Sequence, residues 1–501
     1  MPATATEVSP QQEQSVLAAL RSPRRLRIEV LGGLVVALAL LPEAISCSII
    51  AGVDPRVGLF ASFTMAVTIA IVGGRPAMIS AATGSVALVV APLARDYGVE
   101  YLTATVVLAG VFQMLLGGLG VARLMRFIPR SVMVGFVNAL AILIFLAQLT
   151  HVIDVPWLVY PLVAAGLGII VLLPKLTNLI PAPLVAIVLL TAATIVFGFG
   201  VPDVGDEGDL PDSLPALLVP DVPLTWHTLT IIAPYAFTMA IVGLLESLMT
   251  AKFVDDITDT HSDKSRESVG QGVANLVTGF FGGMGGCAMI GQTMINVKAS
   301  GARTRISTFL AGVFLLILVV VLGDVVALIP MAALVAVMIM VSVGTFDWHS
   351  IQPKTLRRMP KSETLVMVAT VAVTVATGNL AYGVVVGVII AMVLFARRVA
   401  HMTDVVEVAH PDPDTRVYAV RGEMFFASSN DLVYQFDYAG DPQNVVIDMS
   451  GAHIWDASTV ATLDAVATKY EAKGKSATIT GLAGHSAARH GRLSGYLAGG
   501  N

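Results

Sequence analysis

Apolar runs alternate with short polar or basic loops from residue 29 to residue 400. A transmembrane helix needs about 20 mostly apolar residues, so this pattern predicts a polytopic α-helical membrane protein. Full spans are predicted on both sides of a polar loop at residues 201–225. They lie at residues 29–50, 57–73, 100–121, 131–151, 157–174, 181–200, 228–254, 266–282, 304–328, 330–344, 363–379 and 381–400.

Two shorter segments interrupt this series. Residues 77–94 begin with small and polar side chains, and residues 288–297 follow the glycine-rich run 282–286. Ten residues of helix cover about 15 Å, half of the hydrocarbon core, and irregular backbone is tolerated there only beside protein or a water-filled cavity. The pattern favours two half-helices at mid-membrane whose N-termini face an anion. The alternative is that the glycines only allow close helix packing.

Counting the half-helices gives seven segments before the loop and seven after it. An odd number of segments turns the second half upside down in the membrane, which is the inverted-repeat plan of many transporters. Glu43 and Glu246 occupy similar places 203 residues apart, and Gly84 and Cys287 are separated by the same interval. The sequence therefore predicts a 7+7 inverted repeat.

Lys and Arg test the orientation, because cytoplasmic loops carry an excess of both. With fourteen segments, only Arg56 and Arg95 fall outside, and both termini are predicted to lie in the cytoplasm. The predicted parts are a cytoplasmic tail (1–28), a transmembrane domain (29–401) with repeat one (29–200), an extracellular loop (201–225) and repeat two (226–401), and a cytoplasmic C-terminal domain (402–501).

Composition separates the tail from the membrane body. The 501 residues are 55% hydrophobic and 13% charged, with a net charge of -5 and a mean hydropathy of +0.80. Residues 402–501 hold 12 acidic and 7 basic residues and carry the whole imbalance, which indicates a water-soluble domain and excludes nucleic-acid binding. The spacing of a catalytic dyad, a zinc site or a Walker loop is absent, so neither an enzyme, a metal nor a cofactor is predicted. Cys47 and Cys287 are interpreted as inert packing residues.

Two carboxyls within predicted spans are candidates for proton coupling. A charged side chain at the centre of a membrane helix costs about 3 kcal/mol, so Glu43 and Glu246 need a reason to be there. A carboxyl that gains and loses a proton beside an anion site can couple the movement of the two. The alternative is a helix-to-helix hydrogen bond.

Neutral hydrogen-bonding groups lie near the starts of the half-helices and could surround an oxyanion without adding charge. Alternatively, the hydroxyls bond only to their own backbone. Gln271 and Asn275 are interpreted as packing residues, and Asp255 with Asp256 as a solvated helix end rather than a cation site. The candidate substrate-binding residues are Glu43, Thr83, Gly84, Ser85, Ala288, Gly291, Gln292 and Thr293.

Strands and helices alternate from about Val405 onward, which predicts a small α/β domain. TRVYAVRGEMFFAS, VVIDMS and ATITGL read as strands, and ASTVATLDAVATKYEAKG reads as an amphipathic helix. DLVYQF is predicted to start another helix, and the last helix is expected to be short or disordered.

Several of these stretches together resemble the sulfate permease (SulP) family, bacterial relatives of prestin and pendrin. They are LLPEAISCSIIAGVDPRVGLFAS, GQGVANLVTGFFGG, INVKASGARTRIS and VVIDMSGAHIWDASTV. The resemblance covers nearly the whole chain and implies a core domain of segments one to four and eight to eleven. Segments five to seven and twelve to fourteen would form a gate domain, with the anion held between segments three and ten. It also implies elevator-like transport, a homodimer, and a C-terminal STAS domain in which Ser458 falls near a phosphorylated serine.

One departure from the resemblance bears on the substrate. Many family members carry an arginine at the place of Gln292, where it helps to hold the anion. Without that charge, a carboxylate, dicarboxylate or bicarbonate is favoured over sulfate, and proton-coupled symport is the leading hypothesis. The alternatives are an uncoupled anion exchanger or channel, and an anion-sensing receptor that signals through the STAS domain to a cytoplasmic protein.

Overall fold

The computed structural model describes residues 14–496 except 122, 124–127, 177–181, 212, 401–402, 409–411 and 430–431. The chain divides into two compact units, Met1–Val388 and Ile389–Asn501. Eight helices of the described residues are long and apolar enough to cross a membrane, and two more are apolar but shorter. The prediction of a polytopic α-helical membrane protein with a C-terminal α/β domain is confirmed.

Each predicted segment has a counterpart among the elements. Repeat one contains α3 (Pro23–Ala51), α4 (Pro55–Val72), β1 (Ser80–Ala81), α5 (Gly84–Tyr97), α6 (Val99–Gly118), α7 (Arg130–Leu149), α8 (Val159–Leu176) and α9 (Ala182–Phe197). Repeat two contains α10 (Trp226–Thr258), α11 (Lys264–Phe280), β2 (Cys287–Ala288), α12 (Ile290–Met294), the π-helical turn η3 (Ile295–Ala299), α13 (Arg305–Ala327), α14 (Met331–Thr345), α16 (Lys361–Thr377) and α17 (Leu380–Ala400). The short elements α2 (Val16–Leu20), η2 (Val204–Glu207) and α15 (Pro353–Arg358) were not anticipated.

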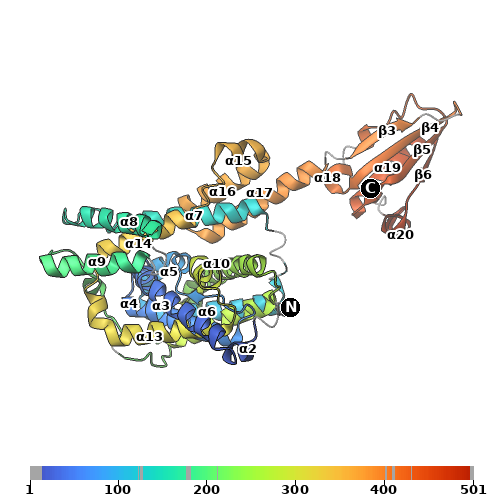
Figure 1. Ribbon diagram of the computed structural model, residues 1–501. Coiled ribbons are helices and arrows are strands. Elements are labelled where there is room, and N and C mark those ends of the chain that lie inside the picture. The colour runs from blue at the N-terminus through green and yellow to red at the C-terminus, as the bar shows by residue number, and fades with distance from the viewer. Residues whose placement is uncertain are drawn as a thin grey trace, which may run out of the picture. The chain divides into compact units, whose positions relative to one another are not determined.

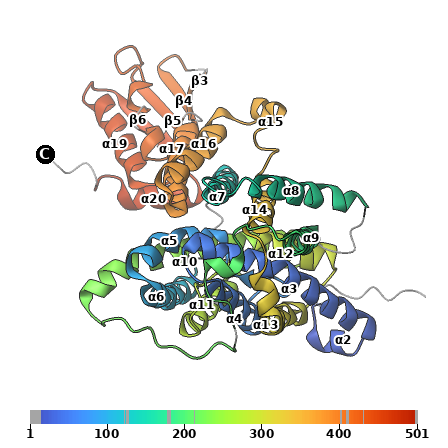
Figure 2. The same ribbon diagram turned by 90° about the vertical axis from the view of Figure 1, so that its left-hand side faces the viewer.

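The membrane helices form two groups, as Figures 1 and 2 show from two directions. In the core, α3 to α6 and α10 to α13, helix α11 packs on α6 and α4, and α13 packs on α3 and α4. In the gate, α7 to α9 with α14, α16 and residues 380–388 of α17, helix α7 packs on α14 and α16. The groups meet where α14 and α9 contact α3 and where α7 contacts α5. This division matches the predicted core and gate.

Helix α11 is a membrane segment that hydropathy alone does not single out. Its sequence contains Glu267, Gln271, Asn275 and Thr278, all fully buried. These side chains are tolerated because α4, α6, β1 and the loops before β1 and β2 supply hydrogen-bond partners in place of water.

The two half-helices are joined through short strands that precede them. β1 and β2 pair antiparallel, with Ser80 opposite Ala288 and Ala81 opposite Cys287. This pairing gives hydrogen-bond partners to backbone N–H and C=O groups of the unwound segments, which lipid could not provide. A Cβ on Gly286 would lie 2.0 Å from the Ala81 carbonyl oxygen, so only glycine allows the two chains to approach so closely.

Several helix boundaries depart from the prediction. The first half-helix, predicted at 77–94, begins at Gly84 because β1 occupies Ser80–Ala81 and Thr83 caps α5. The second half-helix begins at Ile290 rather than Ala288, because Cys287 and Ala288 are extended in β2. Since the first half-helix starts at Gly84, the two starts are 206 residues apart, and Gly84 and Cys287 are not equivalent positions. Helix α3 begins at Pro23, six residues before the predicted span, with proline at a position that favours it.

The second unit contains a four-stranded sheet. Its order is β3 (Asp404–Val408), β4 (Thr415–Met424), β5 (Asn444–Ile454) and β6 (Ser476–Thr480), with β3 antiparallel to β4 and the others parallel. Its helical elements are α18 (Phe426–Ser429), η4 (Leu432–Tyr434), α19 (Ala457–Glu471) and α20 (Gly484–Leu493). The helix predicted to start in DLVYQF was wrong, since this stretch forms only the three-residue turn η4, while α20 shows an ordered last helix.

Candidate functional site

The crossing of β1 and β2 brings four elements together. α5 contacts α3 and α10, and α12 also contacts α3 and α10. The first N–H groups of any helix lack a partner within the helix. The first backbone N–H groups of α5 and of α12 therefore both lie near this crossing. Both predicted carboxyls belong to the flanking helices, Glu43 to α3 and Glu246 to α10.

Glu246 receives hydrogen bonds from residues that precede or begin both half-helices. The Ser85 hydroxyl donates to Glu246 Oε2, and the Cys287 thiol donates to the same oxygen at 3.2 Å. Thr83 Oγ1 lies 3.0 Å from Ser85 Oγ and 3.2 Å from Cys287 Sγ. Only 7% of Glu246 is exposed. A buried carboxyl is thus held by a hydroxyl of repeat one and a thiol of repeat two, and Thr83 contacts both of these donors.

Glu43 has a different partner. The Gln292 amide donates from Nε2 to Glu43 Oε2 at 2.6 Å, while Gln292 Oε1 is buried without a hydrogen-bond partner among the described residues. Glu43 is only half-buried and lies close enough to Glu246 for the two carboxyls to interact electrostatically. An unpartnered buried acceptor is costly, so this amide is incompletely satisfied.

The other predicted residues surround this pair. Thr293 Oγ1 accepts from the Ile79 backbone N–H at 3.0 Å, and so its hydroxyl fastens α12 to the segment before β1. The Ala288 N–H donates to Ser247 Oγ at 3.1 Å. Gly84 faces Ile144 of the gate, whereas Gly291 has no atom within 4 Å of the place of a Cβ. Open space therefore adjoins the site at Gly291.

Sequence reasoning missed the role of Cys287. It was interpreted as an inert packing residue, but its thiol contacts Glu246, Thr83 and Ser85. Its place directly before the second half-helix was the available signal. Cys47, by contrast, is fully buried, and no hydrogen bond of its thiol is found among the described residues.

Gln271 and Asn275 join helix to strand, in line with their predicted packing role. Gln271 Nε2 donates to Ser80 Oγ at 2.7 Å. Asn275 accepts from the Gly286 N–H at 2.9 Å and donates to the Gly286 carbonyl at 3.0 Å. These amides hold β1 and β2 in the positions that define the site.

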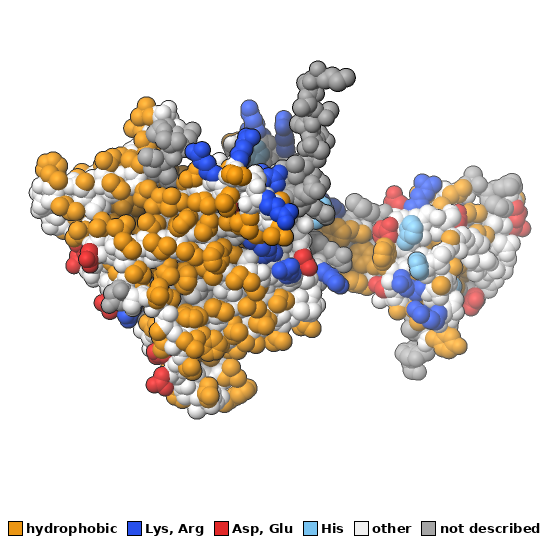
Figure 3. Space-filling model, turned by 60° about the horizontal axis from the view of Figure 1, so that its bottom comes forward, with side chains coloured by type: hydrophobic (Ala, Val, Ile, Leu, Met, Phe, Trp, Pro, Cys, Tyr) orange, Lys and Arg blue, Asp and Glu red, His pale blue; other side chains and the backbone are white. Residues whose placement is uncertain are grey.

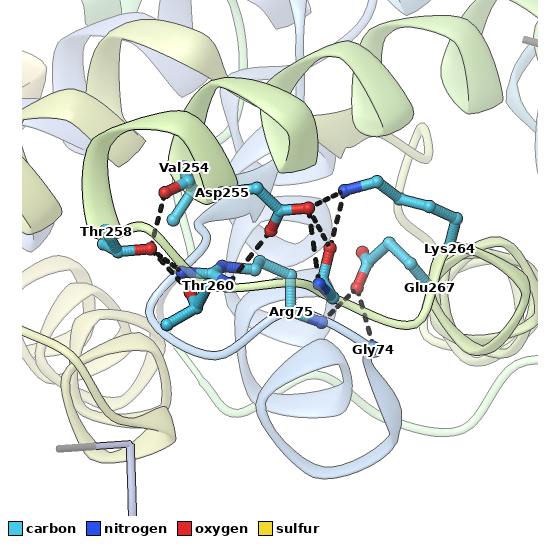
Figure 4. A network of polar contacts seen from close by, with 9 residues as sticks. Gly74, Arg75, Val254, Asp255, Thr258, Thr260, Lys264 and Glu267 are labelled. Atoms are coloured by element: carbon cyan, nitrogen blue, oxygen red, sulfur yellow. Dashed lines mark hydrogen bonds and ion pairs between the residues drawn. The ribbon is translucent and has the colours of Figure 1, made fainter. Parts of the chain in front are cut away.

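The interpretation of Asp255 as a solvated helix end was wrong. Arg75 Nη1 donates to Asp255 Oδ1 at 2.9 Å, and Lys264 Nζ lies 2.5 Å from Oδ2 (Figure 4). Glu267 accepts from the N–H groups of Gly74 and Arg75 at 2.7 and 2.9 Å. Because the Arg75 side chain is only 2% exposed, its charge requires this carboxylate partner. The network ties the loop before β1 to α10 and α11.

Metal ligands do not cluster in the part of the chain that the structure describes. No group of three or more His, Cys, Asp or Glu residues there could hold a metal ion. The chemistry available at the site is therefore that of two carboxyls, hydroxyls, a thiol and an amide.

Two family models match this chain. The model of the sulfate permease family matches residues 26–159 and 159–370, and the STAS domain model matches residues 407–490. A Bacillus subtilis (strain 168) protein with the name "Putative sulfate transporter YbaR" is 53% identical over 457 residues, which are 91% of this chain and 95% of that one. The bicarbonate transporter BicA of Picosynechococcus sp. is 26% identical over 525 residues, 93% and 90% of the two chains.

Two solved structures superpose on this chain. The transmembrane domain of a cyanobacterium bicarbonate transporter BicA superposes with a TM-score of 0.64 at 27% identity, covering 74% of this chain and 98% of that one. The murine Slc26a9 anion transporter in the inward-facing state superposes with a TM-score of 0.82 at 17% identity, covering 100% and 93%. At that identity the second likeness shows the fold alone.

Proposed function

Because the chain belongs to the sulfate permease family, a family of transporters rather than enzymes, we propose that it is a proton-coupled symporter of a small anion. Carboxylates, including dicarboxylates, and bicarbonate are favoured over sulfate as substrates. The anion would bind beside Glu43, Glu246 and the starts of the two half-helices. The core would then carry it past the gate in an elevator-like motion.

Charge balance supports the coupling. Among the described residues, no Lys or Arg side chain donates a hydrogen bond to Glu43 or Glu246, whose donors there are an amide, a hydroxyl and a thiol. Bringing an anion next to two carboxylates in a region of low dielectric constant is unfavourable, and adding a proton to either one removes much of that cost. Anion binding and proton binding therefore assist each other.

The Glu43–Gln292 pair carries the proposal, because it offers a device for this coupling. With Glu43 ionised, the Gln292 NH2 group is occupied by the carboxylate and its oxygen is left without a partner. A protonated Glu43 could instead donate to that oxygen after the amide rotates by 180°, since the two ends of an amide have nearly the same shape. The NH2 group would then be available to the anion.

The neutral Gln292 amide also bears on the charge of the preferred anion. A neutral amide neutralises no charge, so a singly charged anion is better suited to it than a doubly charged one. At neutral pH, bicarbonate and a monoprotonated dicarboxylate carry one negative charge, whereas sulfate carries two. Two relatives named BicA are described as bicarbonate transporters.

Uptake into proteoliposomes tests the proposal. Labelled fumarate, bicarbonate and sulfate are compared with and without an inward proton gradient, for the wild type, Glu43→Gln and the exposed control Glu363→Gln. We expect one anion to accumulate saturably under the gradient, and Glu43→Gln alone to lose the response. Uptake that ignores the gradient in the wild type would leave an uncoupled exchanger or channel. An absence of accumulation for every anion would favour a receptor.

Orientation, assembly and regulation belong to the same proposal. Figure 3 shows an apolar surface with Lys and Arg gathered mostly along one border and Asp and Glu along the opposite one. By the positive-inside rule, this pattern supports an orientation with both termini in the cytoplasm, and a location in the bacterial cytoplasmic membrane belongs to the same proposal. A homodimer and a cytoplasmic partner of the STAS domain remain predictions.

Ser458 remains a proposed regulatory residue. It is exposed in the first turn of α19, and the helix cap is Asp456, which accepts from the Thr459 N–H at 3.0 Å. A cap role for Ser458 is therefore unnecessary, and its hydroxyl is accessible for modification.

A further inference from the structure

A surface cavity of about 600 Å³ lies between the end of α6 and the start of α11. It is separate from the site at the half-helix crossing and shares no residue with it. Its wall is formed by the end of α6, the start of α11 and the end of α4. The lining residues are Val72, Gly117, Gly118, Leu119, Gly120, Arg123, Ser265, Arg266, Val269, Gly270 and Val273.

The floor of this cavity is apolar and continues along α6. Leu115 and Leu119 of α6 are 57% and 81% exposed. A Cβ added to Gly118 would meet no atom within 4 Å, whereas a Cβ added to Gly117 would collide with Val269. The glycines therefore leave a shallow furrow beside side chains that face the lipid.

The rim of the cavity is basic. Arg266 donates from Nε to the Val72 carbonyl at 3.1 Å, and among the described residues its terminal nitrogens and the Arg123 side chain have no hydrogen-bond acceptor or carboxylate partner. Arg305 lies near enough to Arg266 for the two cations to repel each other. Asp263 accepts a hydrogen bond from the Arg266 backbone N–H, at 2.9 Å, and so is engaged as the cap of α11. The rim therefore carries two guanidinium groups that form no ion pair among the described residues, with the Asp263 carboxylate as an acidic neighbour of Arg266.

We propose that this cavity binds an anionic phospholipid. Arg123 and Arg266 would hold the headgroup phosphate, for which guanidinium groups are well suited, and an acyl chain would lie in the furrow beside Gly118. Basic pockets between transmembrane helices at the cytoplasmic side recognise lipid headgroups by this chemistry. A free inorganic anion would use the arginines but not the furrow, which is why a lipid fits better.

Native mass spectrometry of the full-length protein in detergent tests the proposal, with phosphatidylglycerol titrated against neutral phosphatidylcholine. Two variants disturb different parts of the cavity: Arg123→Gln with Arg266→Gln removes the rim charge, and Gly118→Trp fills the furrow while keeping both arginines. The matched controls are Arg357→Gln with Arg358→Gln, on the exposed helix α15, and Gly168→Trp, at another open helix position. A parallel titration adds inorganic phosphate as a competitor.

We expect the wild type and both controls to retain phosphatidylglycerol over phosphatidylcholine. Each arginine removed should weaken retention about fivefold, and Gly118→Trp should weaken it as well. Equal retention of the two lipids, or an equal loss in the control variants, would overturn the proposal. Displacement by inorganic phosphate together with normal retention in Gly118→Trp would identify a simple anion site instead.

Discussion

At the scale of single residues, the two carboxyls of the site are not equivalent. Glu246 is buried and accepts from a hydroxyl and a thiol, whereas Glu43 is half-buried and paired with one amide. The group with the less complete set of partners is the one whose proton can exchange with less disturbance. We therefore assign the coupling role first to Glu43 and regard Glu246 as the carboxyl that links the two half-helices.

Replacing the Gln292 amide by a permanently charged side chain should make anion uptake independent of proton movement. In Gln292→Arg the guanidinium would pair with Glu43 permanently, so the charge of the site would no longer require a proton. Uptake should become independent of the proton gradient, and sulfate uptake should rise relative to bicarbonate. Gradient-driven uptake in proteoliposomes measures this, with Gln352→Arg as a control for added surface charge. A Gln292→Arg protein that stays fully gradient-dependent would contradict the amide's role.

The thiol of Cys287 should matter for transport through its hydrogen bond to Glu246. Cys287→Ala removes that donor. The loss of a hydrogen bond to a buried charged group costs about 1.5 kcal/mol, and if that cost falls on the transport barrier, the initial uptake rate should be about tenfold lower. Cys287→Ser keeps a donor and should retain most of the rate. Cys47→Ala serves as the control, because no hydrogen bond of its thiol is found among the described residues. Equal rates for Cys287→Ala and Cys287→Ser would return Cys287 to a packing role.

At the scale of elements, the site depends on the crossing of two strands of two residues each. β1 and β2 pair across the repeats, Gln271 and Asn275 bond to the unwound backbone, and the Arg75–Asp255 network anchors the preceding loop. The β1–β2 pairing, the Gln271–Ser80 bond and the Arg75–Asp255 pair join repeat one to repeat two, whereas the Asn275–Gly286 bond lies within repeat two. The half-helix starts are therefore held by the whole core rather than by their own short segments.

Gly286→Ala should destabilise this crossing. The added Cβ would meet the Ala81 carbonyl oxygen at 2.0 Å, and backbone cannot move aside as a side-chain end can, so we expect a loss of about 2–3 kcal/mol. Thermal unfolding of the purified protein measures the effect. Gly291→Ala is the matched control, since its Cβ enters open space. Equal midpoints for the two variants would show that the crossing tolerates a side chain.

At the scale of the whole membrane unit, the core and the gate meet along a shared apolar border. One cluster of buried apolar side chains joins α3 and α13 of the core to α8, α9 and α14 of the gate, and α7 contacts α5. Small sliding of packed groups is a known form of alternating access. The site lies on the core side of this border, where such motion would carry it past the gate.

A crosslink across the border should stop transport. A Cβ on Gly84 would lie 3.1 Å from Ile144 Cδ1, so Gly84→Cys with Ile144→Cys can be joined by a short bifunctional thiol reagent in a Cys47→Ala, Cys287→Ser background. We expect uptake to fall when the same sample is crosslinked and to return if the link is cleaved.

The matched control links two positions within the core. A Cβ on Gly32 would lie 3.3 Å from Ser300 Cβ, a separation near that of natural disulfides. Crosslinking Gly32→Cys with Ser300→Cys should leave uptake unchanged from the uncrosslinked pair. Persistent transport with the border crosslinked would exclude relative motion of core and gate at α5 and α7.

The sequence by itself determined the spans, the division into repeats and the α/β tail. These follow from local requirements: a bilayer demands an apolar run of fixed length, loop charges set orientation, and Glu43 and Glu246 are conspicuous because charge is costly in lipid. Half-helix boundaries were less well predicted, because the extended backbone at Cys287 exists only through its pairing with β1.

Only the tertiary structure decided which groups meet. The Gln292–Glu43 bond joins residues 249 positions apart, and the Cys287–Thr83 contact spans 204 positions. Asp255 resembled a solvated helix end until Arg75, 180 residues away, was found beside it. Contacts between distant segments leave no periodic signal in the chain, because they arise from the packing of two inverted repeats rather than from any local preference.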